Sequence, residues 1–282
     1  MQHYLVNNKM NWLRKPASDT QITHADRLWL YLLATIIMLL LVIPTFIVIP
    51  MSFSDSQYLE FPPETWSTRW YYVYLDSSKW MRATVTSLQV GILTMLVATP
   101  MGTMAAYALF VSGHRAARAI FAFLITPMIV PVILIAIGTF YAYGRVGLNN
   151  TITGLVLAHT VLAAPLIMIV ITSALRNYDL NQERVARSLG ATPLQAFFMI
   201  TLPQIKFSIV TAALLAFLTS FDEVIISIFV SGGKNATLTK HMFSALRDFI
   251  DPTIAAISTI MILVSTTLLL ATQFFSGKAK KD

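Results

Sequence analysis

The chain has 282 residues, and little of it is charged. Hydrophobic residues make up 56% and charged residues 12%, against the roughly 25% charged residues of soluble proteins, and the mean hydropathy is +0.68. This composition excludes intrinsic disorder and an ordinary cytosolic enzyme. Cysteine is absent, which excludes disulfides, thiolate zinc sites and cysteine nucleophiles. The net charge of +7 would suit nucleic-acid binding unless its placement has another cause.

Six stretches are long and apolar enough to cross a membrane, since a span needs about 20 mostly apolar residues. Lys and Arg are absent from all of them: 28–53, 83–110, 119–143, 152–174, 207–230 and 253–275. The polar segment 1–27 precedes a hydrophobic stretch too long for a signal peptide, so we expect the first span to be retained. The sequence predicts an all-α membrane protein with six transmembrane helices, in which 1–27 is an N-terminal segment, 28–275 the transmembrane domain and 276–282 a short tail.

The placement of positive charge predicts the orientation. Thirteen Lys and Arg residues fall on the side that holds both termini, and seven fall on the other side. Because cytoplasmic loops carry the excess of Lys and Arg, we expect both termini in the cytoplasm. The net positive charge then marks the inner leaflet, and no nucleic-acid partner is needed to explain it.

Two loops lie on the predicted outer side. The loop 54–82 is rich in Trp and Tyr, which either anchor at the membrane surface or form a docking surface for an external partner. The loop 231–250 lacks an apolar run and is expected to form a structured cap or a short re-entrant element.

The cytoplasmic loop 176–206 carries signals for two short helices. Asp179 with Gln182 fits a capping box, which satisfies the first free amides of a helix. The first helix should run to about Leu189 and stop at Gly190, a residue type that tolerates a left-handed C-terminal cap.

A second helix start follows at once in the same loop. Thr192 is placed as the N-cap, Pro193 as the first helical residue and Gln195 as the end of another capping box. An apolar face then runs to Pro203, which should end the helix; it consists of Leu194, Phe197, Phe198 and Ile200. This face packs on the protein's own spans, lies in the membrane interface, or binds a partner.

The loop resembles the "EAA" loop of ATP-binding-cassette (ABC) importer permeases. Residues 187–191 read Arg-Ser-Leu-Gly-Ala, and Leu202-Pro203 begins twelve residues after Gly190. The usual Glu-Ala-Ala is Arg-Val-Ala at 184–186 here, with Glu183 one residue early. The resemblance implies a coupling helix in a cleft of a cytoplasmic ATPase, with these coupling residues: Glu183, Ala186, Gly190, Leu194, Phe197, Leu202 and Pro203.

Further segments are similar to spermidine/putrescine permeases: 126–131 (Thr-Pro-Met-Ile-Val-Pro), 158–160 with Pro165, 220–225 and 251–256. The resemblance implies a type I ABC importer permease, multi-pass in the bacterial inner membrane, whose last five helices form the core and whose first helix reaches a second permease. It also implies an ATPase dimer that binds ATP and Mg²⁺, and a periplasmic substrate-binding protein. The same branch holds permeases for ferric iron, opines and phosphonates.

The chain is not expected to be an enzyme or to hold a cofactor or metal of its own. A P-loop needs G-x-x-x-x-G-K-[ST], and the nearest match, at Gly233-Lys234, lacks the first glycine and the final hydroxyl residue. Neither HExxH nor G-x-S-x-G occurs. The main rival is a secondary cation-coupled transporter, although six spans without repeated halves count against it.

Asp222 and Glu223 are the carboxylates within the predicted spans. Such residues cost roughly 2.5–3.5 kcal/mol on insertion scales and are functional by default. They contact a cationic substrate, or they lie at a helix break, where they cap backbone amides or pair with a Lys or Arg of a partner. Because adjacent residues point about 100° apart on a helix, one of the two is expected to face the pathway.

Three ring side chains in the third and fourth spans have two interpretations each. Tyr141 and Tyr143 could stack on a cation, but anchoring at the membrane surface is favoured. For His159, a hydrogen bond between packed helices is favoured over a proton relay.

Overall fold

The computed structural model describes residues 23–278, and side-chain burial within them as far as residue 270. Four helices are long and apolar enough to span a membrane: α2 (Leu28–Met51), α4 (Ser78–Ser112), α7 (Ile152–Arg176) and α14 (Thr253–Lys278). Two bent helix pairs raise the number to six if each pair is one span. Over the described residues the fold is helical without strands, as predicted. Most of segment 1–27 and of the tail 276–282 lies outside the described part.

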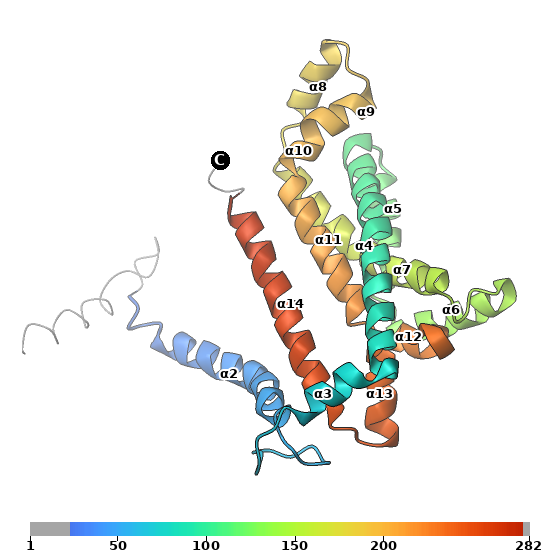
Figure 1. Cartoon of the computed structure of the whole chain (residues 1–282). Helices are drawn as coiled ribbons and strands as arrows, with labels where there is room; N and C mark the ends of the chain where they lie inside the picture. Colours follow the sequence, from blue (N-terminus) through green and yellow to red (C-terminus); the bar gives the residue numbers. More distant parts are fainter. Residues whose placement is uncertain (1–22, 279–282) are drawn as a thin grey trace, which may run out of the picture.

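The core is a packed group of three helices, α4, α7 and α11 (Lys206–Phe221), which Figure 1 shows side by side. The largest fully buried side chains include Ile167 and Ile171 of α7. Glycines of α4 allow the close approach: a Cβ at Gly102 would lie 2.8 Å from Cγ2 of Ile167. Small residues at such contacts let the backbones of membrane helices approach closely. The core therefore forms along the part of α4 that carries small residues.

The third predicted span is broken. The chain forms α5 (Ala117–Leu124) and the short helix η1 (Thr126–Met128), then turns by 92° into α6 (Val132–Val146). Pro127 and Pro131 flank the turn, and proline removes a backbone donor and clashes with the preceding turn. The span expected over 119–143 is thus built from two helices that meet at a bend, and the two prolines mark that bend.

The fifth predicted span is also interrupted. Helix α11 ends at Phe221, and α12 (Ile225–Val230) begins after three residues that include both carboxylates. The expected span over 207–230 therefore contains the helix break that one interpretation of the two carboxylates predicted. The chain then passes through η3 (Gly233–Asn235) into α13 (Leu238–Asp248), so that 231–250 forms the structured cap that the sequence predicted.

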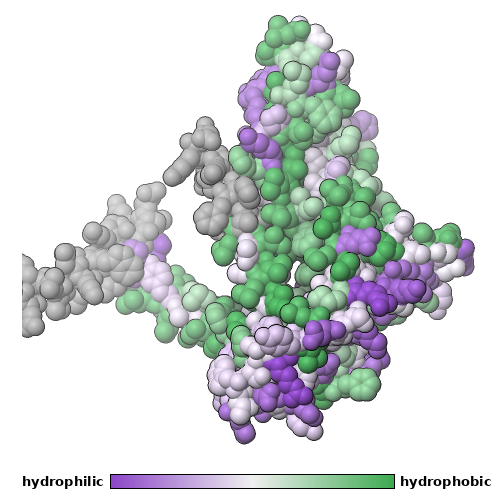
Figure 2. Space-filling model, viewed as in Figure 1, coloured by the Kyte–Doolittle hydropathy of each residue, from purple (hydrophilic) through white to green (hydrophobic). Residues whose placement is uncertain are grey.

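Helix α2 lies apart from the bundle (Figure 1) and has no buried residue. It contacts α14. At the end of the bundle where α3 (Arg69–Asp76) and α13 lie, hydrophilic side chains gather, whereas hydrophobic side chains cover much of the middle (Figure 2). The opposite end carries the loop 176–206, folded into α8 (Asn181–Ser188), α9 (Pro193–Ala196), the π-helix η2 (Phe197–Thr201) and α10 (Leu202–Gln204).

Candidate functional site

The loop 176–206 has the two helix starts that its sequence predicts, with one change. Gly190 follows α8 with φ 98°. Thr192 and Gln195 form the predicted capping box in front of α9. The predicted capping box of Asp179 with Gln182 was wrong, because α8 begins at Asn181; the Asp179 carboxylate instead accepts a hydrogen bond from the Asn181 amide at 2.9 Å.

The second half of the loop ends at Gln204, one residue after the proline that was expected to end it. Phe197–Thr201 forms a π-helix, and Pro203 lies in the first turn of α10, where its missing donor costs nothing. The chain breaks at Ile205 and bends by 79° into α11. The side chains of Gln182 and Gln204 form a hydrogen bond, which joins the start of α8 to the end of α10.

Glu183 points into the protein. Its side chain is buried, and one carboxylate oxygen accepts hydrogen bonds from the hydroxyls of Tyr107 in α4 and Thr201 in η2, both at 2.6 Å. The Tyr107 ring packs against buried Phe197, with centroids 4.5 Å apart. These four residues, which we call the loop anchor, fasten the loop to a core helix. Glu183 and Phe197, predicted as coupling residues, thus face inward.

Tyr178 adds a further hydrogen-bonding group beside the loop anchor. Its hydroxyl lies 3.1 Å from the hydroxyl of Thr201, within hydrogen-bonding distance. Burial raises the pKa of Tyr178, and the charge of Glu183 raises it further, although the hydrogen bond with Thr201 lowers it. Tyr178 therefore stays neutral at physiological pH, and the buried carboxylate meets no second negative charge.

The outer side of the loop is apolar and basic. Leu189 is 85% exposed and Leu194 is 60% exposed. Arg184 and Arg187 are also exposed, on α8. Of the remaining predicted coupling residues, Ala186 and Leu202 are half-buried and Pro203 is exposed. An exposed apolar surface of this kind marks a contact with another protein or with the membrane.

Replacing Tyr107 with phenylalanine is expected to lower the stability of the protein by about 1–3 kcal/mol, because a buried carboxylate then loses one of its two donors. The measurement is the melting temperature of the purified protein in detergent. Tyr72→Phe, at an exposed tyrosine of α3, is the matched control. Equal melting temperatures for the two variants would contradict a stabilising role of this hydrogen bond.

Glu223 is buried at the break of the fifth span and caps α12. Its carboxylate oxygens accept hydrogen bonds from the amides of Ile226 at 2.8 Å and Ser227 at 3.0 Å. His159 of α7 lies 3.6 Å from the same carboxylate, and its other ring nitrogen lies 2.7 Å from the hydroxyl of Ser220. Glu223 thus follows the capping interpretation, and His159 is the predicted hydrogen-bonding residue between packed helices.

Asp222 differs from its neighbour, because its side chain is exposed. It lines a cavity of about 710 Å³ between α2, α11 and α14. Hydroxyl groups line the same cavity, from Thr45, Thr219, Ser265 and Thr266. A carboxylate among hydroxyls can accept hydrogen bonds from an ammonium group.

Tyr141 and Tyr143 do not reach this cavity. Tyr141 is 70% exposed on α6, and Tyr143 is half-buried against the cluster that includes Val90 and Ala136. Neither tyrosine is therefore placed to contact, together with Asp222, a cation in this cavity.

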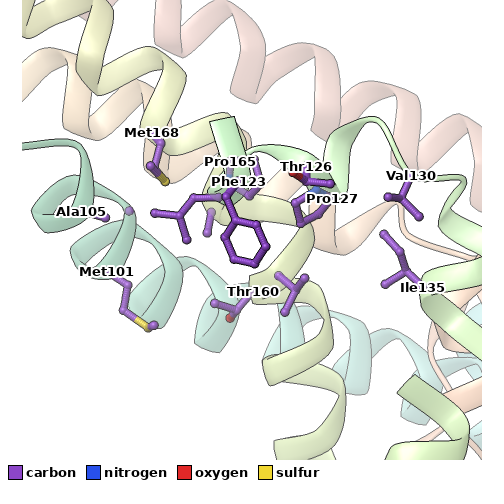
Figure 3. Close-up of a pocket in the computed structure, with 14 residues that line it drawn as sticks. Met101, Ala105, Phe123, Thr126, Pro127, Val130, Ile135, Thr160, Pro165 and Met168 are labelled. Carbon is purple, nitrogen blue, oxygen red and sulfur yellow. The ribbon is translucent and has the colours of Figure 1, made fainter. Parts of the chain in front are cut away.

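The sequence did not predict a second cavity, of about 480 Å³, between α4, the α5–η1 segment and α7 (Figure 3). Its lining is almost wholly apolar and includes Met101, Phe123 and Pro127. The buried hydroxyl of Thr160 faces no hydrogen-bond partner among the described residues. The paired prolines, which bend the third span away from α7, were the signal that could have indicated this cavity.

Comparisons with known proteins agree with the fold and with the loop. Residues 98–281 match the profile of the family described as "Binding-protein-dependent transport system inner membrane component". The putrescine transport system permease protein PotI of Escherichia coli (strain K12) is 36% identical over 205 residues, 70% of this chain and 73% of PotI. The spermidine/putrescine transport system permease protein PotC of Haemophilus influenzae is 29% identical, over 84% of this chain and 92% of PotC.

Solved structures show the same fold at low sequence identity. A chain of a bacterial ABC transporter involved in the import of the acidic polysaccharide alginate superposes with a TM-score of 0.70 at 15% identity, covering 89% of this chain and 98% of that one. A chain of the MetNI methionine ABC transporter superposes with a TM-score of 0.53 over 72% of this chain and 99% of that one. The fold is that of ABC importer permeases, and the family profile covers well over half of the sequence: this chain belongs to the binding-protein-dependent transport system inner membrane components.

Proposed function

We propose that this chain is a permease subunit of an ABC importer that carries a polyamine, such as spermidine or putrescine, across the bacterial inner membrane. The exposed carboxylate of Asp222, in a cavity lined by hydroxyls, is the observation that carries the substrate class. A carboxylate attracts ammonium groups and disfavours the anionic phosphonates that other members of the branch transport. The names of the relatives PotI and PotC support the same substrate class.

The energy for transport comes from a partner. The loop 176–206 offers an apolar and basic surface at Leu189, Leu194, Arg184 and Arg187, which suits a cleft in a cytoplasmic ATPase dimer that binds ATP and Mg²⁺. In this arrangement the loop end of the molecule and both termini face the cytoplasm, and the end with α3 and α13 faces outward. Movement of the ATPases would pass through the loop anchor to α4.

The remaining partners follow from exposed apolar surface. Helix α2 buries none of its residues, so a second, homologous permease is its expected partner in a heterodimer. A periplasmic binding protein delivers the substrate; a related transporter, for alginate, has been solved in complex with its periplasmic protein.

Uptake of labelled spermidine and putrescine tests the proposal, in cells that lack this chain and in the same cells after re-expression. We expect uptake to fall and then return. Deleting the partner ATPase should also abolish uptake, whereas a secondary transporter would continue to work. Unchanged uptake in cells without another polyamine system would refute the polyamine assignment.

A further inference from the structure

Four basic side chains surround one pocket at the end of the bundle where α3 and α13 lie. Lys79 and Arg82 come from the start of α4, Lys234 from η3 and His241 from α13. The pocket has a volume of about 400 Å³, and its other lining residues are small. We call it the basic pocket.

The charges of the basic pocket are not neutralised within the described part of the chain. Lys79, Arg82 and Lys234 are exposed, and no described carboxylate forms an ion pair with them. Burial and the charge of Lys79 lower the pKa of His241, while Asp251 raises it. Since α4 begins at this point, its macrodipole adds further positive potential. Three positive charges in one concave site repel one another, and an anion that enters the site is attracted by all three.

The basic pocket is held in shape by hydrogen bonds outside its lining. The side-chain amide of Asn235 donates to the carbonyl of Asn150 at 2.6 Å, which fixes η3 to the loop before α7. The amide of Leu238 donates to the hydroxyl of Ser87 at 2.8 Å, which fixes the start of α13 to α4. These hydrogen bonds therefore hold in place the segment that carries Lys234, and ligand binding does not need to order that segment.

We propose that the basic pocket receives a carboxylate side chain of the external substrate-binding protein, so that this protein docks on α4, η3 and α13. This docking role rests on the proposed function. The transported substrate is not the occupant, because a polyamine is itself a cation and Lys79, Arg82 and Lys234 would repel it. The pocket lies at the opposite end from the loop 176–206, where the proposed orientation places the binding protein. A carboxylate on a loop of that protein can enter a concave site of this size.

The test uses the complete importer reconstituted in liposomes, with its ATPases and both permeases. ATPase activity is measured while the polyamine-loaded binding protein is titrated, and each curve is normalised to the rate without binding protein. The double variant Lys79→Glu with Arg82→Glu should raise the half-maximal concentration of binding protein about tenfold or more, since like charges then face each other. The shift should shrink as salt is added, because exposed charges are screened.

Arg145→Glu is the matched control, since Arg145 is an exposed arginine at the end of α6 and does not line the basic pocket. It should leave the half-maximal concentration unchanged. A milder pair, Lys79→Gln with Arg82→Gln, should give a smaller shift in the same direction and guards against misfolding of the double reversal.

Two results would overturn the docking role. If the wild-type importer is stimulated and both pocket variants give the wild-type half-maximal concentration, the basic pocket does not dock the binding protein. If the variants respond only to the fraction of phosphatidylglycerol in the liposomes, the occupant is a lipid phosphate. A wild-type importer that the binding protein fails to stimulate would instead refute the proposed function.

Discussion

Replacing Asp222 with asparagine is expected to lower polyamine uptake about tenfold or more at limiting substrate. Loss of a hydrogen bond to a charged group costs about 1.5–3 kcal/mol, and each 1.4 kcal/mol is a factor of ten. The effect should be strong here because Asp222 is the exposed carboxylate of the cavity between α2, α11 and α14, while its neighbour Glu223 is occupied in capping α12.

The measurement is the initial rate of labelled spermidine uptake over a range of concentrations, corrected for the amount of permease in the membrane. Asp222→Glu keeps the charge and should retain much of the rate. Asp248→Asn, at an exposed carboxylate of α13 outside the cavity, should behave like wild type. Wild-type kinetics in Asp222→Asn would leave Asp222 without a role in the pathway.

Gly190→Val is expected to abolish coupling between ATP hydrolysis and transport without preventing insertion into the membrane. Gly190 has φ 98° between α8 and α9, a conformation that a β-branched residue adopts only with strain. A Cβ there would meet no atom within 4 Å, so the backbone and not crowding is the cause. A changed turn would displace Leu189 and Leu194 relative to each other.

The measurements are uptake and the ATPase activity of the assembled complex. Uptake is expected below about a tenth of wild type if the turn refolds to relieve the strain of about 1–3 kcal/mol. Gly190→Asn should fall between wild type and Gly190→Val, because asparagine tolerates positive φ better. Gly113→Val, at another glycine of positive φ that lies outside the loop, is the control. Full uptake in Gly190→Val would show that the turn does not transmit the ATPase movement.

The local signals in the sequence were reliable where neighbouring residues decide the structure. Thr192 with Gln195 caps a helix as predicted, and Gly190 adopts a positive φ. These features depend on a few consecutive residues. Asp179 with Gln182 carried the same kind of signal, but Gln182 bonds to Gln204 instead, 22 residues away, and so a distant contact overrode a local one.

The sequence by itself determined the apolar spans, the cap residues and the prolines that mark the bend, because hydropathy, helix capping and backbone restriction act over short stretches of chain. It could not determine which acidic side chain faces a partner. Glu183 was expected at the ATPase but is buried against Tyr107. Of two adjacent carboxylates that line one cavity, Asp222 is exposed, whereas Glu223 is buried and caps a helix. Lys79 and Lys234 likewise meet at one pocket although they are 155 positions apart in the sequence. Tertiary structure alone decided these arrangements, since burial and charge neutralisation depend on residues that only folding brings together.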